Sequence, residues 1–561
     1  MANRHRVKWC SRSLPFETPD QMGPMTASGD FDYVIVGAGS AGAVLANRLS
    51  TDPAIRVCLI EAGRRDRSPL IGIPLGVIWL AKDPRHNWLF KSTPQPGLGG
   101  RVVTVPRGKA LGGSSAINGM IYIRGHRADY NGWAAAGCIG WGYDDVLPHF
   151  RRSELNCNPA MDEAFHGTSG PLSVSDLRDP NPVDRDFIAA AAGLQIRPCP
   201  DFNVPEPEGV GIYQVTQKDG SRHSTAAAFL AGITSRRNLT VMTGAEVQRI
   251  DLAGGVAQAV VLRRADGTDE RITARAEVIL CAGTIGSPDI LLRSGIGPAA
   301  QIAGFGGSVL HDLPGVGQNL QDHVDCMVIC RSRSRVPYGI SAGALPRLAL
   351  EGLRWLVGRR GMLASNMVEA GGFVRSSPSE TRPDIQFHLI PGRKSHRGRM
   401  LEYGHGVSLH TCVLRPDSRG SVTRDTPGGA PLIDLGLLSA ASDIERLLRG
   451  VKLARRILQQ PAMARHGLTE IIPGAATQDD AGLRAFIRAN ARTVYHPVGT
   501  CAMGIGPGAV VDPRLRVHGV KRLRVVDASV MPTIVSGNTN APAIMIAEKA
   551  ADMIVADRRG N

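Results

Sequence analysis

The chain has 561 residues, so it is too long for a single compact core, and we expect more than one structural unit. Its hydrophobic fraction of 43% argues against wholesale disorder. The net charge of +15 comes mostly from arginines that are spread along the chain, which argues against a nucleic-acid-binding function. No run of 18 apolar residues occurs, so we expect no membrane span. We expect a cytoplasmic location and leave peripheral association with an anionic membrane surface open.

Residues 1–30 are polar and lack the apolar core of a signal peptide. We interpret them as a flexible tail, with Met25 as an alternative start. The ten cysteines lie at irregular spacings, without a pair or a histidine partner at the spacing of a zinc site. We therefore expect buried free thiols, a reducing compartment and no metal site.

The first structured segment has the pattern of a βαβ unit. Residues 32–36 (DYVIV) are short, β-branched and followed by glycine, which is typical of a buried strand. Residues 40–50 are permissive for a helix, and residues 56–60 form a second apolar run. Strand, glycine turn, helix and strand follow one another within about 30 residues.

The turn itself reads GxGxxG. Gly37 would allow the tight turn, Gly39 would let the backbone approach a pyrophosphate, and Gly42 would let the helix pack close to the strand. Glu61, which lies 19 residues after Gly42, can accept hydrogen bonds from a ribose diol. The segment predicts dinucleotide binding without separating NAD from FAD, and the acid at the ribose position disfavours NADP.

Further along the chain the pattern changes several times. Residues 64–150 show no regular pattern, and residues 166–225 indicate loops and short strands. Residues 239–263 alternate between apolar and polar side chains, as in a small antiparallel sheet. The later elements that we expect are a strand at 277–281, helices at 287–294 and 343–360, strands of a second sheet at 368–375 and 407–414, a helix at 441–459, a strand at 522–526 and a helix at 541–556.

A second glycine-rich segment covers residues 106–131 (PRGKALGGSSAINGMIYIRGHRADYN). Its glycines would bring backbone N–H groups close to a ligand, and its short polar side chains add hydrogen bonds. Apolar residues between them predict that the segment is buried. We interpret it as a buried wall that is rich in hydrogen-bonding groups.

Residues 106–131 and 283–297 (GTIGSPDILLRSGIG) resemble the two signature patterns of the glucose–methanol–choline (GMC) oxidoreductase family. The resemblance continues through 313–323, 414–422, 495–504 and 525–552, and so covers almost all of 31–556. It implies FAD rather than a nicotinamide. It also implies an α/β fold, in which a Rossmann-like FAD-binding domain carries an inserted α+β substrate-binding domain built on an antiparallel sheet. The expected division is a tail at 1–30, a discontinuous FAD-binding domain at 31–155, 225–325 and 485–558, and a substrate-binding domain at 156–224 and 326–484.

The family's chemistry removes a hydride from an alcohol carbon, which needs a base for the hydroxyl proton and a donor to the oxygen. The resemblance places His496 of YHPVGTCAMG (495–504) as the base, and histidine suits this task because its ordinary pKa is about 6.5. The second family position, a histidine or asparagine about 40 residues later, falls on Asn538. A slip of one step would exchange its role with that of Asn540. An asparagine cannot act as a base at neutral pH, so His496 would carry the proton.

The resemblance also implies a set of FAD contacts. The ADP half would meet Gly37, Gly39, Ser40, Ala41, Glu61 and Ala62, with Val247 at the adenine. The flavin side would be lined by Gly108, Gly112, Gly113, Ser114, Asn118 and Gly119. The other family positions are Ala282, Asp527, Ala528, Thr539 and Asn540. Some members attach FAD covalently through a histidine at the position of Ile117, so we expect non-covalent FAD here.

The substrate is less clearly indicated. Residues 367–375 (MVEAGGFVR) resemble the choline and alcohol dehydrogenase branch, and Glu369 would either face a cationic substrate or pair with an arginine. Tyr495 is the clearest aromatic near the site, whereas a quaternary ammonium usually needs a cage of aromatic side chains. We therefore expect a small neutral primary alcohol, aliphatic or aryl, and keep choline as the alternative. Oxygen and a quinone-type acceptor both stay open, as do the oligomeric state and a cyanohydrin lyase that uses FAD without net redox.

Overall fold

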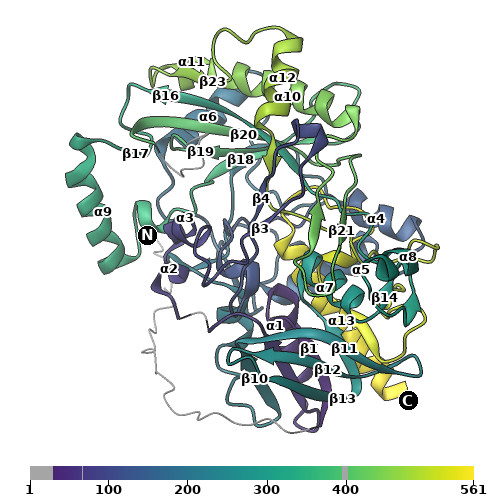
Figure 1. The fold of residues 1–561 in the computed structure, drawn as a ribbon. Coiled ribbons are helices and arrows are strands. Elements are labelled where there is room, and N and C mark those ends of the chain that lie inside the picture. Colours follow the sequence, from purple (N-terminus) through teal and green to yellow (C-terminus); the bar gives the residue numbers. More distant parts are fainter. Residues whose placement is uncertain (1–29, 66, 395–401, 561) are drawn as a thin grey trace.

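The computed structural model describes residues 30–65, 67–394 and 402–560, and these are built around two sheets at opposite ends of the molecule (Figure 1). The first sheet has seven strands in the order β10-β2-β1-β13-β12-β11, with β25 beside β13. Its strands are β1 (Phe31–Val36), β2 (Val57–Glu61), β10 (Leu239–Thr243), β11 (Ala245–Ala253), β12 (Val256–Arg264), β13 (Asp269–Leu280) and β25 (Leu523–Val525).

The βαβ unit expected at the start of the chain is present. β1 and β2 pair in parallel and are almost entirely buried, and α1 (Ser40–Leu49) connects them. The last helix, α13 (Asn540–Gly560), packs beside α1 (Figure 1). The antiparallel sheet expected over 239–263 begins only at β11, because β10 pairs in parallel with β2. β13 joins both patterns, since it pairs antiparallel with β12 and in parallel with β1 and β25.

The second sheet has eight strands in the order β23-β16-β20-β19-β18-β7, with β17 beside β20 and β24 beside β16. It is antiparallel throughout, as expected for the inserted domain. Its strands are β7 (Gly209–Ile212), β16 (Val324–Ser332), β17 (Gly339–Ile340), β18 (Ala370–Val374), β19 (Ile385–Ile390), β20 (Gly404–Val413), β23 (Thr469–Ile472) and β24 (Arg492–Thr493). The mixed and antiparallel sheets confirm the predicted α/β fold class.

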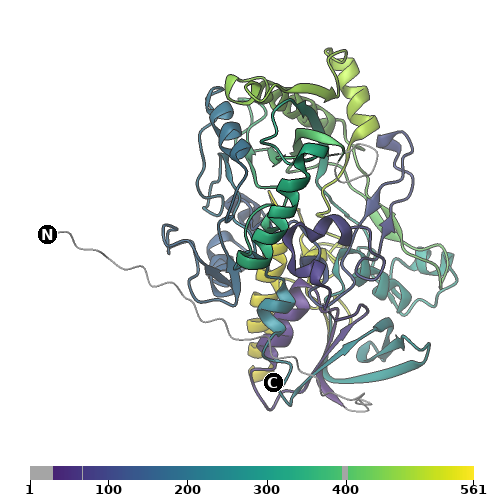
Figure 2. The ribbon, with the colours of Figure 1, turned by 90° about the vertical axis from the view of Figure 1, so that its left-hand side faces the viewer.

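Helices cover both sheets. The helices α6, α10, α11 and α12 lie over the end of the molecule that holds the second sheet, and α9 stands away from the body (Figures 1 and 2). The helices beyond α1 and α13 are α2 (Pro69–Gly72), α3 (Val77–Leu80), α4 (Arg127–Ala135), α5 (Tyr143–Ser153), α6 (Pro182–Ala192), α7 (Gly283–Arg293), α8 (Ala299–Gly304), α9 (Leu345–Gly358), α10 (Ala441–Leu458), α11 (Pro461–Ala464) and α12 (Asp480–Asn490). Among the described residues, no helix combines the length and the apolar character that crossing a membrane requires.

Five helices lie in segments that we expected to be irregular: the one-turn helices α2 and α3 and the longer α4, α5 and α6. α4 begins with a capping box, in which the His126 side chain accepts the Ala128 N–H and the Asp129 carboxylate accepts the His126 N–H. α5 follows in the same segment. α6 begins after Asn181, whose side chain accepts the Val183 N–H, with Pro182 in the first turn. These caps stabilise helix ends that apolar periodicity alone does not reveal.

The segment after β24 carries the chain from the second sheet to the first. Thr493 pairs with Val324 of the second sheet, and Leu523 pairs with Val278 of the first. His496 lies just after β24, so it is held at the end of the second sheet while the chain turns toward the first sheet.

The remaining short strands form two-stranded pairs: β3 (Phe90–Lys91), β4 (Thr104–Val105), β5 (Glu154–Asn156), β6 (Leu172–Val174), β8 (Gln217–Lys218), β9 (Ser221–Arg222), β14 (Ile296–Gly297), β15 (His311–Asp312), β21 (Ser421–Thr423) and β22 (Leu432–Asp434).

Candidate active site

The glycine turn after β1 has no room for a side chain at two of its three glycines, Gly37 and Gly42. Gly37 has φ +99°, and a Cβ there would lie 2.5 Å from the carbonyl oxygen of Cys281 at the end of β13. A Cβ on Gly42 would lie 1.9 Å from the Gly37 carbonyl oxygen. Both contacts are with backbone, which cannot move aside, so glycine is required at each position.

The second glycine segment lies against this turn. The Gly112 N–H donates to the Ala38 carbonyl at 2.8 Å. A Cβ on Gly113 would lie 2.7 Å from Gly39 Cα, and Gly113 has φ +52°. The structure therefore brings together two backbones that are more than 70 residues apart in sequence.

Two helix N-termini meet at the same place. α1 begins at Ser40 without a side-chain cap and without an acidic residue in its first turn. α13 begins at Asn540, and the Ser40 hydroxyl donates to its Oδ1 at 2.7 Å. Uncapped N–H groups and aligned peptide dipoles make such helix ends favourable for anions such as phosphates.

Two buried carboxylates border this cradle. The N–H groups of Ala38 and Gly63 donate to Glu61 at 2.9 and 2.8 Å, and burial raises the pKa of Glu61 to about 7. The Gly283 N–H and the Ser287 hydroxyl donate to Asp527 at 2.9 and 2.6 Å, and burial raises the pKa of Asp527. Glu61 thus ends β2, and Asp527 holds the first turn of α7.

The other predicted cofactor residues are distributed around the same elements. The Asn118 amide oxygen accepts the Met120 N–H at 3.0 Å and Arg222 Nη1 at 2.9 Å, so this loop is held from outside the cradle. Ser114 accepts the Gly108 N–H at 3.2 Å. Ala41 lies in α1, Ala62 follows β2, Val247 is buried in β11, Ala282 precedes α7, Ala528 follows Asp527, Gly119 follows Asn118, and Thr539 precedes α13.

The catalytic pair expected from the sequence is in contact. Asn538 Nδ2 and His496 Nε2 lie 3.1 Å apart, whereas Asn540 bonds Ser40 in the cradle. The structure therefore places Asn538, not Asn540, beside the histidine. The His496 N–H donates to the Asp322 carboxylate at 2.9 Å, which holds the backbone of this short run.

Further residues hold the run around His496. Tyr495 has φ +71°, and its carbonyl accepts Arg107 Nη2 at 2.5 Å. The Pro497 carbonyl accepts the Thr284 hydroxyl at 2.7 Å, which connects the run to α7. His496 is thus fixed from the backbone on both sides.

Two side chains that we did not single out from the sequence contact the pair. His323 Nδ1 lies 3.0 Å from His496 Nδ1, and the two rings stand edge to face. Gln386, from β19, donates to the Asn538 amide oxygen at 3.1 Å. Both are buried.

The surroundings keep both histidines uncharged. Burial lowers the pKa of His496 well below its ordinary value, and His323, His388 and Arg107 lower it further. Burial lowers the pKa of His323 to about 4. Burial raises the pKa of Asp322 to about 6. At neutral pH His496 is therefore an unprotonated imidazole, as a general base must be.

Sequence and structure comparisons identify the family of the chain. Sequence models of the N- and C-terminal domains of GMC oxidoreductases match residues 31–325 and 416–547. An alcohol dehydrogenase (acceptor) of Pseudomonas putida is 46% identical over 94% of this chain and 96% of its own length. An oxygen-dependent choline dehydrogenase of Rhizobium etli is 40% identical over 93% of this chain and 95% of its own. The crystal structure of pyridoxine 4-oxidase from Mesorbium loti superposes with a TM-score of 0.82 at 33% identity, covering 93% of this chain and 98% of the other. The chain belongs to the GMC oxidoreductase family.

The cofactor of GMC oxidoreductases, FAD, fits the residues present. The Gly39 backbone excludes a side chain at Gly113, and the two helix N-termini suit a pyrophosphate. Glu61 lies at the end of β2, where the ribose of a dinucleotide is held in this fold. FAD would supply the hydride acceptor, and the chain's own residues would hold it and the substrate.

Glu369 does not offer its carboxylate to a substrate. The side chain is completely buried and is bound by the Asn181 N–H at 2.6 Å, by the Tyr338 hydroxyl at 3.0 Å and by the Ser365 hydroxyl. Burial raises the pKa of the neighbouring Asp184 well above its ordinary value, and Glu369 raises it further. The arginine pairing expected for Glu369 is thus corrected, because N–H and hydroxyl groups of the protein hold its carboxylate, and its burial disfavours the expected contact with a substrate cation. Tyr495, by contrast, is 41% exposed beside His496.

Proposed function

We propose that this GMC oxidoreductase oxidises a neutral primary alcohol, aliphatic or aryl, to the aldehyde. The observation that carries the proposal is the contact between an uncharged His496 and the amide of Asn538 at 3.1 Å. His496 Nε2 takes the hydroxyl proton, and Asn538 Nδ2 donates to the substrate oxygen. FAD, when bound, would accept the hydride from the same carbon, so two electrons and both hydrogens are accounted for.

A neutral alcohol suits the charges around the pair. Arg107 lies close enough to lower the pKa of His496, and the carboxylates of Asp322 and Glu369 are occupied by protein groups. The one aromatic that we assign to the site is Tyr495, whereas a quaternary ammonium is usually enclosed by several. Choline would therefore bind less well than an uncharged alcohol of similar size.

The test is a panel of aliphatic and aryl alcohols, choline and cyanohydrins, mixed with the flavin-loaded protein without oxygen. Bleaching of the 450 nm flavin band by neutral alcohols, with choline slower at equal concentration, is the expected result. Faster bleaching by choline would assign a choline dehydrogenase instead. Cleavage of a cyanohydrin with an unbleached flavin would assign a lyase, and a preparation without the flavin band would contradict FAD chemistry altogether.

We also propose that the FAD is bound without a covalent link, because Ile117 stands where a histidine carries the link in some members. Acid precipitation should leave a yellow supernatant, and flavin that stays in the pellet would contradict this. Gly113→Ala, whose Cβ would press on Gly39 Cα, should lower the FAD content while leaving the rate per bound flavin unchanged. The matched control is Gly132→Ala on the exposed side of α4, where a Cβ meets no atom within 4 Å. Equal FAD content in both variants would count against the cradle.

The electron acceptor is either oxygen or a quinone-type molecule, and we favour the quinone because α9 offers a surface for a membrane. Three aliphatic side chains of α9 are largely exposed: Leu353 by 56%, Leu356 by 71% and Val357 by 83%. Arginines border them, at Arg347 and Arg354 within the helix and at 359–360 after it. An amphipathic helix with exposed aliphatic residues and bordering arginines matches an anionic lipid surface.

Co-sedimentation with vesicles tests this surface. The protein should bind vesicles of phosphatidylglycerol and phosphatidylcholine but not phosphatidylcholine alone, and Leu356→Gln with Val357→Gln should abolish the binding. Ile139→Gln, at an exposed aliphatic position outside α9, is the matched control and should bind as the unmodified protein does. Equal binding by the unmodified protein, the α9 double variant and the Ile139→Gln control would refute the role of α9. Reoxidation of the reduced enzyme by oxygen as fast as by a soluble quinone would remove the reason to favour a quinone.

A further inference from the structure

Two chains of hydrogen bonds meet at Nε2 of His496, and each ends on a peptide carbonyl. A carbonyl oxygen can only accept a hydrogen bond, so each end fixes the direction of every bond along its chain. The position of the protons can therefore be derived from geometry, although hydrogens are not seen directly.

The first chain runs through His323. His323 Nε2 lies 3.0 Å from the Leu414 carbonyl, so Nε2 carries the hydrogen. The ring is completely buried and uncharged, so its Nδ1 is a lone pair. His496 Nδ1, at 3.0 Å, must then be the donor, and this leaves Nε2 of the neutral His496 without a hydrogen.

The second chain runs through Tyr213 and Gln386. The Tyr213 hydroxyl donates to the Phe387 carbonyl at 2.6 Å, so its oxygen accepts Gln386 Nε2 at 3.4 Å. The same nitrogen donates to Asn538 Oδ1 at 3.1 Å. Asn538 therefore turns its Nδ2 toward His496 Nε2, where it can only donate.

The two chains agree at the point where they meet, and neither depends on the other. We propose that His323 and Gln386 are positioning residues, which hold His496 in the tautomer with hydrogen on Nδ1 and hold Asn538 with its NH₂ group toward the reacting atoms. The proposal rests on the proposed function of the His496–Asn538 pair. Without these chains the imidazole could turn a hydrogen toward the alcohol, and the amide could turn its oxygen toward a developing alkoxide, and both changes oppose the reaction.

The same bonds stabilise the proton once it has moved. When the alcohol proton reaches His496 Nε2, the ring becomes an imidazolium, and its Nδ1–H faces the lone pair of His323. A charged donor strengthens that bond. The proton cannot leave through the far end of the chain, because the Leu414 carbonyl accepts the hydrogen bond of His323 but cannot take its proton.

Kinetics of His323 variants give the first test. His323→Leu should lower the limiting rate of anaerobic flavin reduction about 30-fold with little change in the alcohol concentration that gives half the maximal rate. His323→Gln, which can accept from His496 and donate to Leu414, should recover most of the rate. A further variant, Gln386→Met, should lower the limiting rate of flavin reduction about 5-fold. FAD content is measured in each case, so that only flavin-loaded protein is compared.

A matched control separates positioning from the general loss of a buried histidine. His466 is also buried and bonds Asp186 at 2.7 Å, away from both chains. His466→Leu should lower thermal stability without changing the reduction rate. The proposal falls if His323→Leu reduces its flavin as fast as His466→Leu does, or if His323→Gln is as slow as His323→Leu.

Direct observation of the tautomers is independent of activity. Long-range ¹H–¹⁵N spectra of histidine-labelled, flavin-loaded protein should show hydrogen on Nδ1 of one ring and on Nε2 of its neighbour, and these signals should disappear in His496→Asn and His323→Gln respectively. Hydrogen on Nε2 of His496 would overturn the proposal. If the tautomers are as expected but no alcohol reduces the flavin, the proposed function fails and the assignment of the hydrogens stands.

Discussion

Two histidines of this protein, the half-buried His496 and the buried His166, are held in opposite states of charge. The His496 ring contacts another imidazole and an amide. Burial, together with His323, His388 and Arg107, keeps its pKa well below the ordinary value. His166 contacts two carboxylates. Burial alone would lower its pKa, but hydrogen bonds to Asp201 and Glu154 outweigh burial and raise the pKa to about 9.

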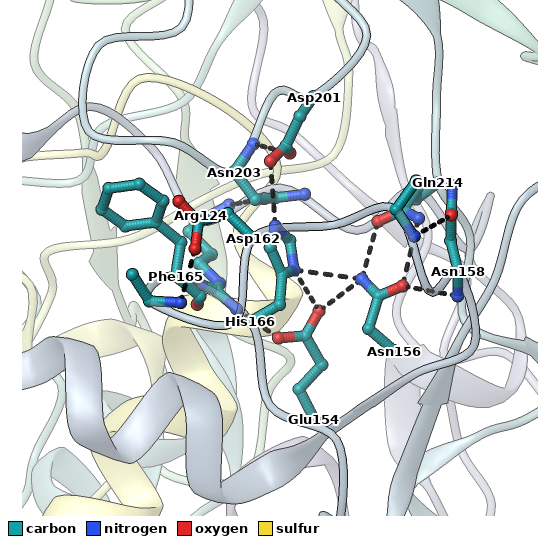
Figure 3. Close-up of polar contacts among 12 residues, drawn as sticks. Arg124, Glu154, Asn156, Asn158, Asp162, Phe165, His166, Asp201, Asn203 and Gln214 are labelled. Atoms are coloured by element: carbon teal, nitrogen blue, oxygen red, sulfur yellow. Dashed lines mark hydrogen bonds and ion pairs between the residues drawn. The ribbon is translucent and has the colours of Figure 1, made fainter.

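The surroundings of His166 form a closed network (Figure 3). Its Nδ1 lies 2.9 Å from Glu154 and its Nε2 lies 2.9 Å from Asp201. Arg124 pairs with the other oxygen of Glu154, and Asn156 bonds the same carboxylate at 2.9 Å. Each charge thus has an opposite neighbour inside the protein, which is the condition for burying charges without a large loss of stability.

The contrast shows how one residue type serves two purposes. A histidine without a carboxylate in contact gives up its proton on burial and becomes available as a base. A histidine between two carboxylates keeps its proton and connects segments of chain. Only the first can take a proton from an alcohol at neutral pH, so the difference in neighbours, rather than burial, separates the proposed base from the histidine that keeps its proton.

The largest expected effect comes from removing the base. His496→Ala should lower the rate constant for anaerobic flavin reduction by about 10³, a typical contribution of general-base catalysis. The FAD content should be unchanged, because the cradle lies on other elements. Stopped-flow absorbance at 450 nm measures both. An unchanged rate would remove His496 from the mechanism and with it the contrast to His166.

Removal of the charged histidine should have the reverse pattern. His166→Gln should reduce the free energy of unfolding by about 3 kcal/mol below pH 6.5, since a pKa raised from 6.5 to about 9 corresponds to that amount. The rate per bound flavin should stay as it was. Urea unfolding and stopped-flow reduction on the same preparation check the two statements. A large loss of rate with full stability would show that the network serves the chemistry instead.

The cofactor cradle could be predicted from the sequence because its constraints are local. Gly37, Gly39 and Gly42 act within six residues, and the strands and helix around them have their own patterns. His496 and Asn538 were predicted through short runs that resemble family landmarks, and the structure shows that the two side chains are in contact. Glu369 was misplaced, because its run of apolar neighbours did not reveal that the carboxylate is itself buried.

The supporting residues could not be predicted in the same way. Gln386 contacts Asn538 only because β19 lies between β18 and β20, and nothing near it in sequence indicates that pairing. His323 ends the run LPGVGQNLQDH (313–323), so a signal existed, but its role depends on the Leu414 carbonyl of a distant strand end. The helix α6 had a usable signal in Asn181-Pro182, which we did not interpret.

A smaller effect should appear in the pH dependence of stability. Because the folded pKa of His166 is raised, its contribution is complete below about pH 6.5 and is lost as the pH rises through about 9. The stability difference between the unmodified protein and His166→Gln should therefore shrink from pH 6 to pH 10. His149→Gln is the control, because burial lowers the pKa of His149 to about 4, so that its titration adds no loss over this range. A difference that stays constant with pH would mean that His166 is uncharged.

The smallest expected effect is the absence of a change where an ordinary histidine would show one. The pKa of His496 is lowered well below 6.5 by burial and by its neighbours, so the base is already unprotonated at pH 6.5. The rate of anaerobic flavin reduction should therefore stay level between pH 6.5 and 8 and decrease only at lower pH, before the protein unfolds. A rate that already falls between pH 7.5 and 6.5 in the unmodified protein would mean that His496, like His166, is held with its proton, and the contrast between the two histidines would be lost.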